Sequence, residues 1–127
     1  MWTQETDDYR TVLHTFQAIF NDNDRVEKIA KNWDRLVLLD STDTGELYAL
    51  VVKDQRIVEV KKVSEYDEDA EGLVHLQAEE EVLKDVFSGK YDPAAALVNG
   101  TLSVFSHERD KVKLEAIAFV MWKRTLG

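Results

Sequence analysis

The chain has 127 residues, a length sufficient for one hydrophobic core, and its composition, 44% hydrophobic and 32% charged, is that of a folded globular protein. It contains no cysteine, which excludes disulfides, thiolate nucleophiles and cysteine-bound iron–sulfur clusters. Its formal net charge of −9 disfavours nucleic acid as a partner, because a phosphate backbone would be repelled. We therefore interpret residues 1–127 as a single domain.

No apolar run reaches the roughly 20 residues that a membrane-spanning helix requires. Apolar runs such as Leu36–Leu39 and Ala116–Trp122 fall well short of this length. The segment Met1–Arg10 is polar and acidic, so it lacks the basic and apolar regions of a secretory signal. We expect no transmembrane segment and a cytoplasmic location.

Apolar residues at helical spacing predict two helices at the start of the chain. The first stripe runs from Tyr9 to Phe20. The second runs from Val26 to Trp33, with Asn23 or Asp24 as the cap of a short helix. Both helices are expected to pack on one face of a sheet.

Three β-rich runs follow, separated by polar turns. Leu36–Leu39 and Leu47–Val52 are joined by the turn residues Ser41–Gly45, which predicts a hairpin. Arg56–Val63 supplies a third, more exposed strand after two further polar residues. The three strands are expected to form a meander.

The middle of the chain predicts a loop, a strand and a helix. Ser64–Gly72 is acidic and typical of a solvated loop. Strand character resumes at Leu73–Gln77, and Ala78–Phe87 contains helix formers with three glutamates in its first turn. This helix is expected to end at Ser88 and Gly89.

The last third of the chain completes the set of elements. Asp92 followed by Pro93 is a good N-cap and first residue for a short helix over Ala94–Val98. Thr101–Phe105 predicts a fifth strand, and Glu108–Thr125 predicts a long final helix. This order favours an α+β fold with a five-stranded mixed sheet and helices over one face.

From Leu73 onward the chain resembles the sterol carrier protein 2 family. The similarity is carried by residues 86–104, VFSGKYDPAAALVNGTLSV, which match the family's helix, Gly-x-x-x-Pro and Gly-x-Leu-x-Val pattern. It covers about the C-terminal half, and the first half agrees in the order of its elements. The resemblance implies a mainly antiparallel sheet and helices that enclose an apolar tunnel for lipids, partly closed by the last helix.

The resemblance also implies a function. It favours a protein that is not an enzyme and needs no cofactor, and that binds or carries a lipid, fatty acyl or isoprenoid ligand. The alternative is an accessory module that presents a hydrophobic substrate, such as a quinone, to a partner enzyme. The residues expected to form the wall of the ligand site are Val86, Phe87, Leu97, Val98, Phe105, Ile117, Phe119, Val120, Met121 and Trp122.

The last helix carries more apolar surface than one core-facing stripe needs, because Leu114–Trp122 is apolar around most of its circumference. Full burial in the core, a homodimer interface and a ligand cavity each explain this surface. Trp33, Phe105 and Trp122 likewise fit either a cavity wall or an ordinary core.

No group of polar residues indicates catalysis or metal binding. The three histidines lie far apart in sequence and lack the paired spacing of a helical zinc site. A triad of Ser88, His75 and Asp85 lacks a nucleophile-elbow sequence. Glu79–Glu81 are consecutive, so they point to different sides of a helix instead of at one bond.

The charge is unevenly distributed along the chain. Ser64–Asp85 holds nine acidic residues and one lysine, whereas Gly100–Gly127 holds five basic and three acidic residues. Weak, transient contact with anionic lipid and ordinary solvation of helix charges both explain the basic excess. The acidic segment is the surface that a partner enzyme would meet.

Overall fold

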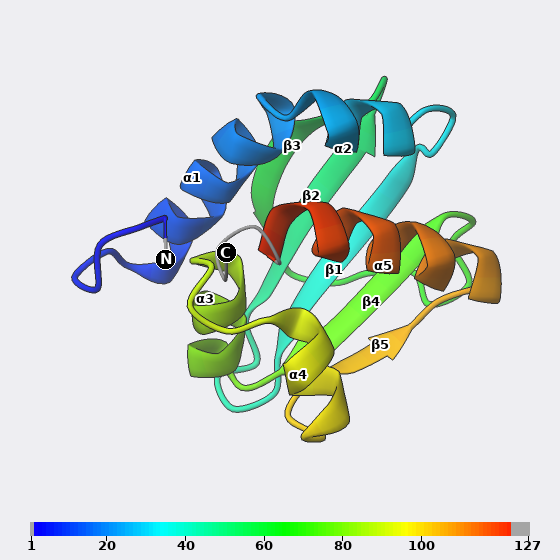
Figure 1. Cartoon of the computed structure of the whole chain (residues 1–127). Coiled ribbons are helices and arrows are strands. Elements are labelled where there is room, and N and C mark those ends of the chain that lie inside the picture. Colours follow the sequence, from blue (N-terminus) through cyan, green and yellow to red (C-terminus); the bar gives the residue numbers. More distant parts are fainter. Residues whose placement is uncertain (1, 123–127) are drawn as a thin grey trace.

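The computed structural model describes residues 2–122, so the predicted end of the last helix, residues 123–125, lies outside it. Helices and strands follow one another in the order that the sequence predicts (Figure 1). The helices are α1 (Tyr9–Asn21), α2 (Asp24–Ile29), α3 (Glu80–Phe87), α4 (Pro93–Val98) and α5 (Glu108–Trp122). The strands are β1 (Arg35–Ser41), β2 (Leu47–Lys53), β3 (Arg56–Val63), β4 (Leu73–Ala78) and β5 (Ser103–Phe105).

The strands form one mixed sheet with the order β3-β2-β1-β4-β5. β1, β2 and β3 pair antiparallel as the expected meander, and β4 pairs antiparallel with β5. Only β1 and β4 pair in parallel, with Leu36 opposite Leu73. The predicted α+β class and mainly antiparallel five-stranded sheet are confirmed.

The helices lie on one face of this sheet (Figure 1). Because side chains alternate along a strand, one set from each long strand points at the helices and joins the core. These core-facing residues are Val37, Leu39, Tyr48, Leu50, Val52, Ile57, Val74, Leu76 and Ala78. None of the described helices is long and apolar enough to cross a membrane.

The segment 64–72 carries the chain from the edge strand β3 past β2 and β1 to β4. Most of its residues are exposed, as expected, but the ring of Tyr66 lies edge-on to His75, with centroids 5.0 Å apart. His75 points away from the helices, since its neighbours Val74 and Leu76 belong to the core. The segment therefore crosses the face of the sheet opposite the helices.

Side chains cap two helices where the sequence predicts caps. Asn23 accepts two backbone N–H bonds through its Oδ1, so Asn23 and not Asp24 caps α2. Asp92 Oδ1 accepts the N–H of Ala94 at 2.8 Å, and Pro93 is the first residue of α4. Each cap satisfies N–H groups that the helix itself cannot pair.

The second helix is shorter than predicted. α2 ends at Ile29, and Trp33 lies beyond it, in the segment that leads to β1. Asn32 has a φ of 57°, in the left-handed region that a continuing right-handed helix cannot contain. The prediction of a helix through Trp33 was therefore wrong, although Trp33 is buried.

The first described residues form a strap over the end of α3. Trp2 donates its backbone N–H to the Ser88 carbonyl at 2.8 Å and its indole N–H to the Phe87 carbonyl at 2.7 Å. Its ring also packs against Trp122, with centroids 5.6 Å apart. This packing depends on Gly89, because a Cβ there would lie 2.5 Å from the Trp2 ring.

Candidate functional site

An apolar cavity of about 450 Å³ lies between the helix-covered face of the sheet and helices α3, α4 and α5. Every strand contributes to its wall, as does α1. The lining residues are Phe16, Phe20, Trp33, Val37, Leu50, Val52, Ile57, Leu76, Val86, Phe87, Asp92, Pro93, Ala94, Leu97, Leu102, Val104, Lys111, Leu114, Glu115, Ile117, Ala118, Phe119 and Trp122. All but three are apolar, so the cavity offers water few hydrogen-bond partners.

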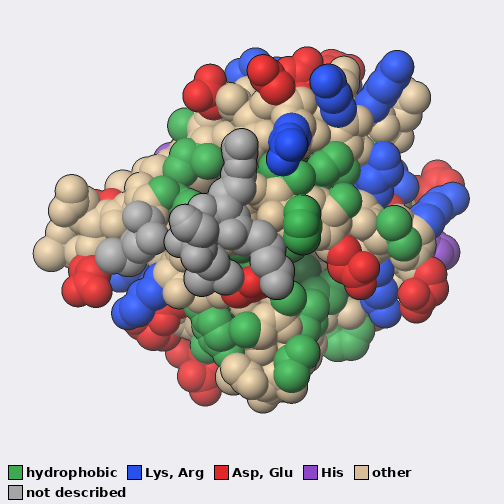
Figure 2. Space-filling model, viewed as in Figure 1, with side chains coloured by type: hydrophobic (Ala, Val, Ile, Leu, Met, Phe, Trp, Pro, Cys, Tyr) green, Lys and Arg blue, Asp and Glu red, His purple; other side chains and the backbone are tan. Residues whose placement is uncertain are grey.

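The exposure and the position of the lining residues distinguish a mouth from a deep end. Leu97 of α4 and Phe119 of α5 are exposed and mark the mouth. Hydrophobic side chains gather over the surface where these two helices lie (Figure 2). Phe20, Trp33 and Ile57 are also buried, and they lie beside the end of α1 and the segment after α2, on the side of α5 away from α4 (Figure 1). We call this side the deep end. A molecule that enters between α4 and α5 therefore meets these three side chains last.

The three charged lining residues are Asp92, Lys111 and Glu115, and none of them is buried. Asp92 is engaged as the N-cap of α4. Lys111 Nζ lies 3.4 Å from Glu108 Oε1, in an exposed pair one turn apart on α5. These groups can orient the polar end of a ligand, while the remaining wall accepts only apolar surface.

The structure brings together six of the ten residues that the sequence assigned to the ligand site. Val86, Phe87, Leu97, Ile117, Phe119 and Trp122 line the apolar cavity. Val98 is exposed outside the lining, and Val120 and Met121 are buried in the core. Phe105 borders a different hollow. Ligand contact by any of the ten stays a prediction.

The sequence analysis missed the contribution of α1 and most of the strands to this wall. Phe16, Leu50 and Leu76 were visible as parts of helical or alternating apolar patterns. Such a pattern identifies the side that faces inward. It cannot separate a side chain that fills the core from one that borders a cavity.

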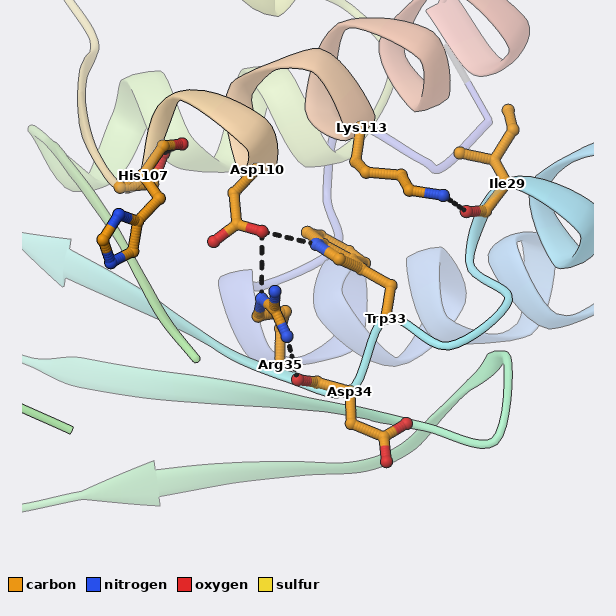
Figure 3. Close-up of polar contacts among 8 residues, drawn as sticks. Ile29, Trp33, Asp34, Arg35, His107, Asp110 and Lys113 are labelled. Atoms are coloured by element: carbon orange, nitrogen blue, oxygen red, sulfur yellow. Dashed lines mark hydrogen bonds and ion pairs between the residues drawn. The ribbon is translucent and has the colours of Figure 1, made fainter. Parts of the chain in front are cut away.

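A buried carboxylate, that of Asp110, holds the indole of Trp33 in place (Figure 3). Asp110 of α5 is only 2% exposed. Its Oδ1 accepts the indole N–H of Trp33 at 2.8 Å and the Nε–H of Arg35 at 3.0 Å. The Arg35 guanidinium also lies 5.8 Å from the centroid of the Trp33 ring. Because a buried carboxylate needs such donors, the three side chains fix one another.

Further hydrogen bonds fasten α5 above the cavity at both ends. Lys113 donates its ammonium to the carbonyl of Ile29 at 2.7 Å (Figure 3). Near the other end, the indole N–H of Trp122 reaches the carbonyl of Val86 at 2.8 Å. α5 is thus a fixed roof, and its contacts reach both α2 and α3.

A second hollow, the polar groove, has a volume of about 960 Å³ and shares no lining residue with the apolar cavity. It begins at Arg35 and Asp110 and extends along the crossover segment 64–72. Its lining residues are Asp34, Arg35, Tyr66, Glu68, Asp69, Ala70, Glu71, Gly72, Leu73, His75, Gln77, Phe105, Ser106, His107, Arg109 and Asp110. Charged and polar side chains make this hollow unsuited to an alkyl chain.

The residues of the rejected triad are engaged elsewhere. His75 Nε2 lies 2.9 Å from Asp40 Oδ2, and the Ser88 hydroxyl donates to the backbone carbonyl of Asp85 at 3.0 Å. Within residues 2–122, no group of three or more histidine and acidic side chains could hold a metal ion.

No protein-family model and no curated protein matches the chain. Solved structures do match. A crystal structure of sterol carrier protein 2 has a TM-score of 0.65 and 17% identity, covering 89% of this chain and 92% of that one. The UbiJ-SCP2 ubiquinone synthesis protein has a TM-score of 0.61 and 14% identity, covering 88% and 93%.

The same fold is also part of a larger enzyme structure. The inverting sec-alkylsulfatase Pisa1 from Pseudomonas sp. matches with a TM-score of 0.59 and 18% identity over 84% of this chain. This chain spans only 15% of the length of that enzyme. At these identities the likeness concerns the fold, and it confirms the sterol carrier protein 2-like fold that the sequence predicts.

Proposed function

We propose that the protein binds one elongated apolar molecule, such as a lipid, fatty acyl or isoprenoid chain, in the apolar cavity, and that it carries this molecule without changing it chemically. The observation that carries the proposal is a cavity of about 450 Å³ whose charged lining residues are confined to Asp92, Lys111 and Glu115. The fold, shared with sterol carrier protein 2, supports the same assignment.

The volume indicates the size of the ligand. An engineered protein cavity of about 150 Å³ holds one benzene molecule, so about 450 Å³ corresponds to three such rings. This is on the order of 18 carbon atoms, the size of a long acyl chain. Each buried methylene contributes roughly 0.8 kcal/mol before the costs of association, which is sufficient for tight binding.

A pair of exposed positions on α5 tests the proposal. Phe119 is 66% exposed and lines the mouth of the cavity, whereas Val112 is 67% exposed on the same helix and does not line it. Glutamate at either position is compatible with folding, because both side chains already face solvent. We expect Phe119→Glu to weaken binding of a fluorescent fatty acyl probe by at least about tenfold and Val112→Glu to leave it unchanged. Equal affinities for both variants would contradict the proposed site.

The natural ligand is identified by purifying the protein from its own host and extracting it with organic solvent. Mass spectrometry of this extract, compared with an extract of Phe119→Glu, is expected to show a lipid in the parent protein only. An empty extract, together with failure to bind fatty acyl and isoprenoid probes, would overturn the carrier function.

A second function, presentation of a hydrophobic substrate to a partner enzyme, has support of its own. The similar structures include a ubiquinone synthesis protein and an alkylsulfatase in which this fold is a small part of the chain. The acidic crossover segment 64–72 offers a negatively charged surface on the face of the sheet opposite the helices. An enzyme captured from host lysate at low salt and released at high salt would favour this function over independent carriage.

A further inference from the structure

We propose that Trp33 is the end wall that limits the length of the bound chain, and that Asp110 is the positioning residue that holds this wall in place. The inference rests on the proposed function. It adds a determinant of ligand specificity at the end of the apolar cavity opposite its mouth.

The position of Trp33 gives it this role. Its side chain is only 3% exposed, yet it lines the apolar cavity. The mouth, marked by Leu97 and Phe119, lies at the exposed end between α4 and α5. A chain whose polar end stays at the mouth therefore directs its terminal methyl group toward Trp33.

Trp33 cannot move aside at low cost. Its indole N–H donates to Asp110 Oδ1 at 2.8 Å, and among residues 2–122 this carboxylate has one other hydrogen-bond donor, Arg35 Nε at 3.0 Å. Rotation of the indole would deprive a 2% exposed carboxylate of one of its two donors. The Arg35 guanidinium, which lies over the Trp33 ring at 5.8 Å from its centroid, also restricts movement of the ring (Figure 3).

The surroundings behind the indole make the limit sharp. Asp110 and Arg35 line the polar groove, and the apolar cavity shares no residue with that groove. The two hollows meet at the hydrogen bond between Trp33 and Asp110. An alkyl chain extended past the indole would meet a charged pair and solvated side chains, so added methylenes would gain no apolar contact there.

Binding of saturated fatty acids from C8 to C24, measured by displacement of a fluorescent acyl probe, tests the inference. In the parent protein the affinity is expected to increase by about fourfold per added methylene, up to a limiting length. We expect Trp33→Ala to move this limit to longer chains, because the space of the indole becomes available. Trp33→Leu, which keeps an apolar side chain, is the second variant and is expected to move the limit less. Phe119→Ala, at the mouth, is expected to weaken binding of all chains without moving the limit.

Two substitutions of Asp110 separate its positioning role from a general effect on stability. Asp110→Asn retains an acceptor for the Trp33 N–H and is expected to keep the parent length limit. Asp110→Ala releases the indole, so the affinity is expected to level off gradually with chain length instead of at one limiting length. Circular dichroism is used to confirm that both variants are folded. A parent protein that binds neither fatty acids nor isoprenoid probes would overturn both the function and the inference, and one that binds isoprenoids without any limiting chain length would overturn the inference alone. A length limit that is the same in the parent, Trp33→Ala and Trp33→Leu would overturn the inference alone.

Discussion

Filling the apolar cavity from its roof is expected to stabilise the empty protein and to weaken ligand binding. Ala118 lies on α5, is partly buried, and lines the cavity. Ala118→Phe adds one phenyl ring, and since a benzene molecule occupies a cavity of about 150 Å³, the ring takes about a third of the 450 Å³. Burial of this ring contributes about 2 kcal/mol, which raises the Tm of a domain of this size by roughly 5 to 10 °C.

The same ring removes space for about six carbon atoms of a ligand, so the affinity for a long acyl probe is expected to fall by at least about tenfold. Thermal unfolding without ligand and probe titration measure the two effects in one preparation. Ala116→Phe is the matched control, because Ala116 lies on the same helix but does not line the cavity. If Ala118→Phe lowers the Tm and leaves the affinity unchanged, the region is a packed core and the reasoning fails.

Two further predictions concern the strap and the first turn of α3. Gly89 has a φ of 85°, and a Cβ there would lie 2.5 Å from the Trp2 ring. Gly89→Ala is therefore expected to lower the free energy of unfolding, measured in urea, by about 1 to 3 kcal/mol. The control Gly45→Ala, also at positive φ but with no atom near the added Cβ, is expected to lower it less. Burial and the neighbouring carboxylates of Glu46 and Asp43 raise the pKa of Glu80 above its usual 4.5, so the folded state holds this proton more tightly and stability decreases as pH rises just above 4.5. The free energy of unfolding of Glu80→Gln relative to that of the parent, measured in urea, is therefore expected to be higher at pH 7 than at pH 4. The same difference between variant and parent at pH 4 and pH 7 would contradict this.

Local chemistry was sufficient to predict most elements of this fold. The caps Asn23 and Asp92 and the hairpin turn before Gly45 act within a few residues, so their signals are present in the sequence itself. The error at Trp33 has a local cause as well, since the positive φ of Asn32 ends the helical stretch although the apolar spacing continues. Apolar spacing identifies what is buried, and it does not by itself fix where a helix ends.

The features that the sequence did not reveal depend on long-range contacts. The parallel pairing of β1 with β4 and the crossover over the opposite face follow from how the whole sheet is assembled. The hydrogen bond between Trp33 and Asp110 joins residues 77 positions apart, and nothing near Asp110 in the sequence distinguishes it from a solvated helix acid. The strap made by Trp2 is equally non-local, because its partners Phe87 and Ser88 lie at the end of α3.

The excess apolar surface of the last helix has two different surroundings. Ile117 and Trp122 belong to the core and also border the apolar cavity, whereas Phe119 is exposed at the mouth. Wall residues beside such a space lack the packing contacts that a filled core would give them, so larger apolar side chains in the wall would be expected to stabilise the fold. The small side chains of Ala94 and Ala118 in the wall leave this space open, which supports the ligand site proposed above.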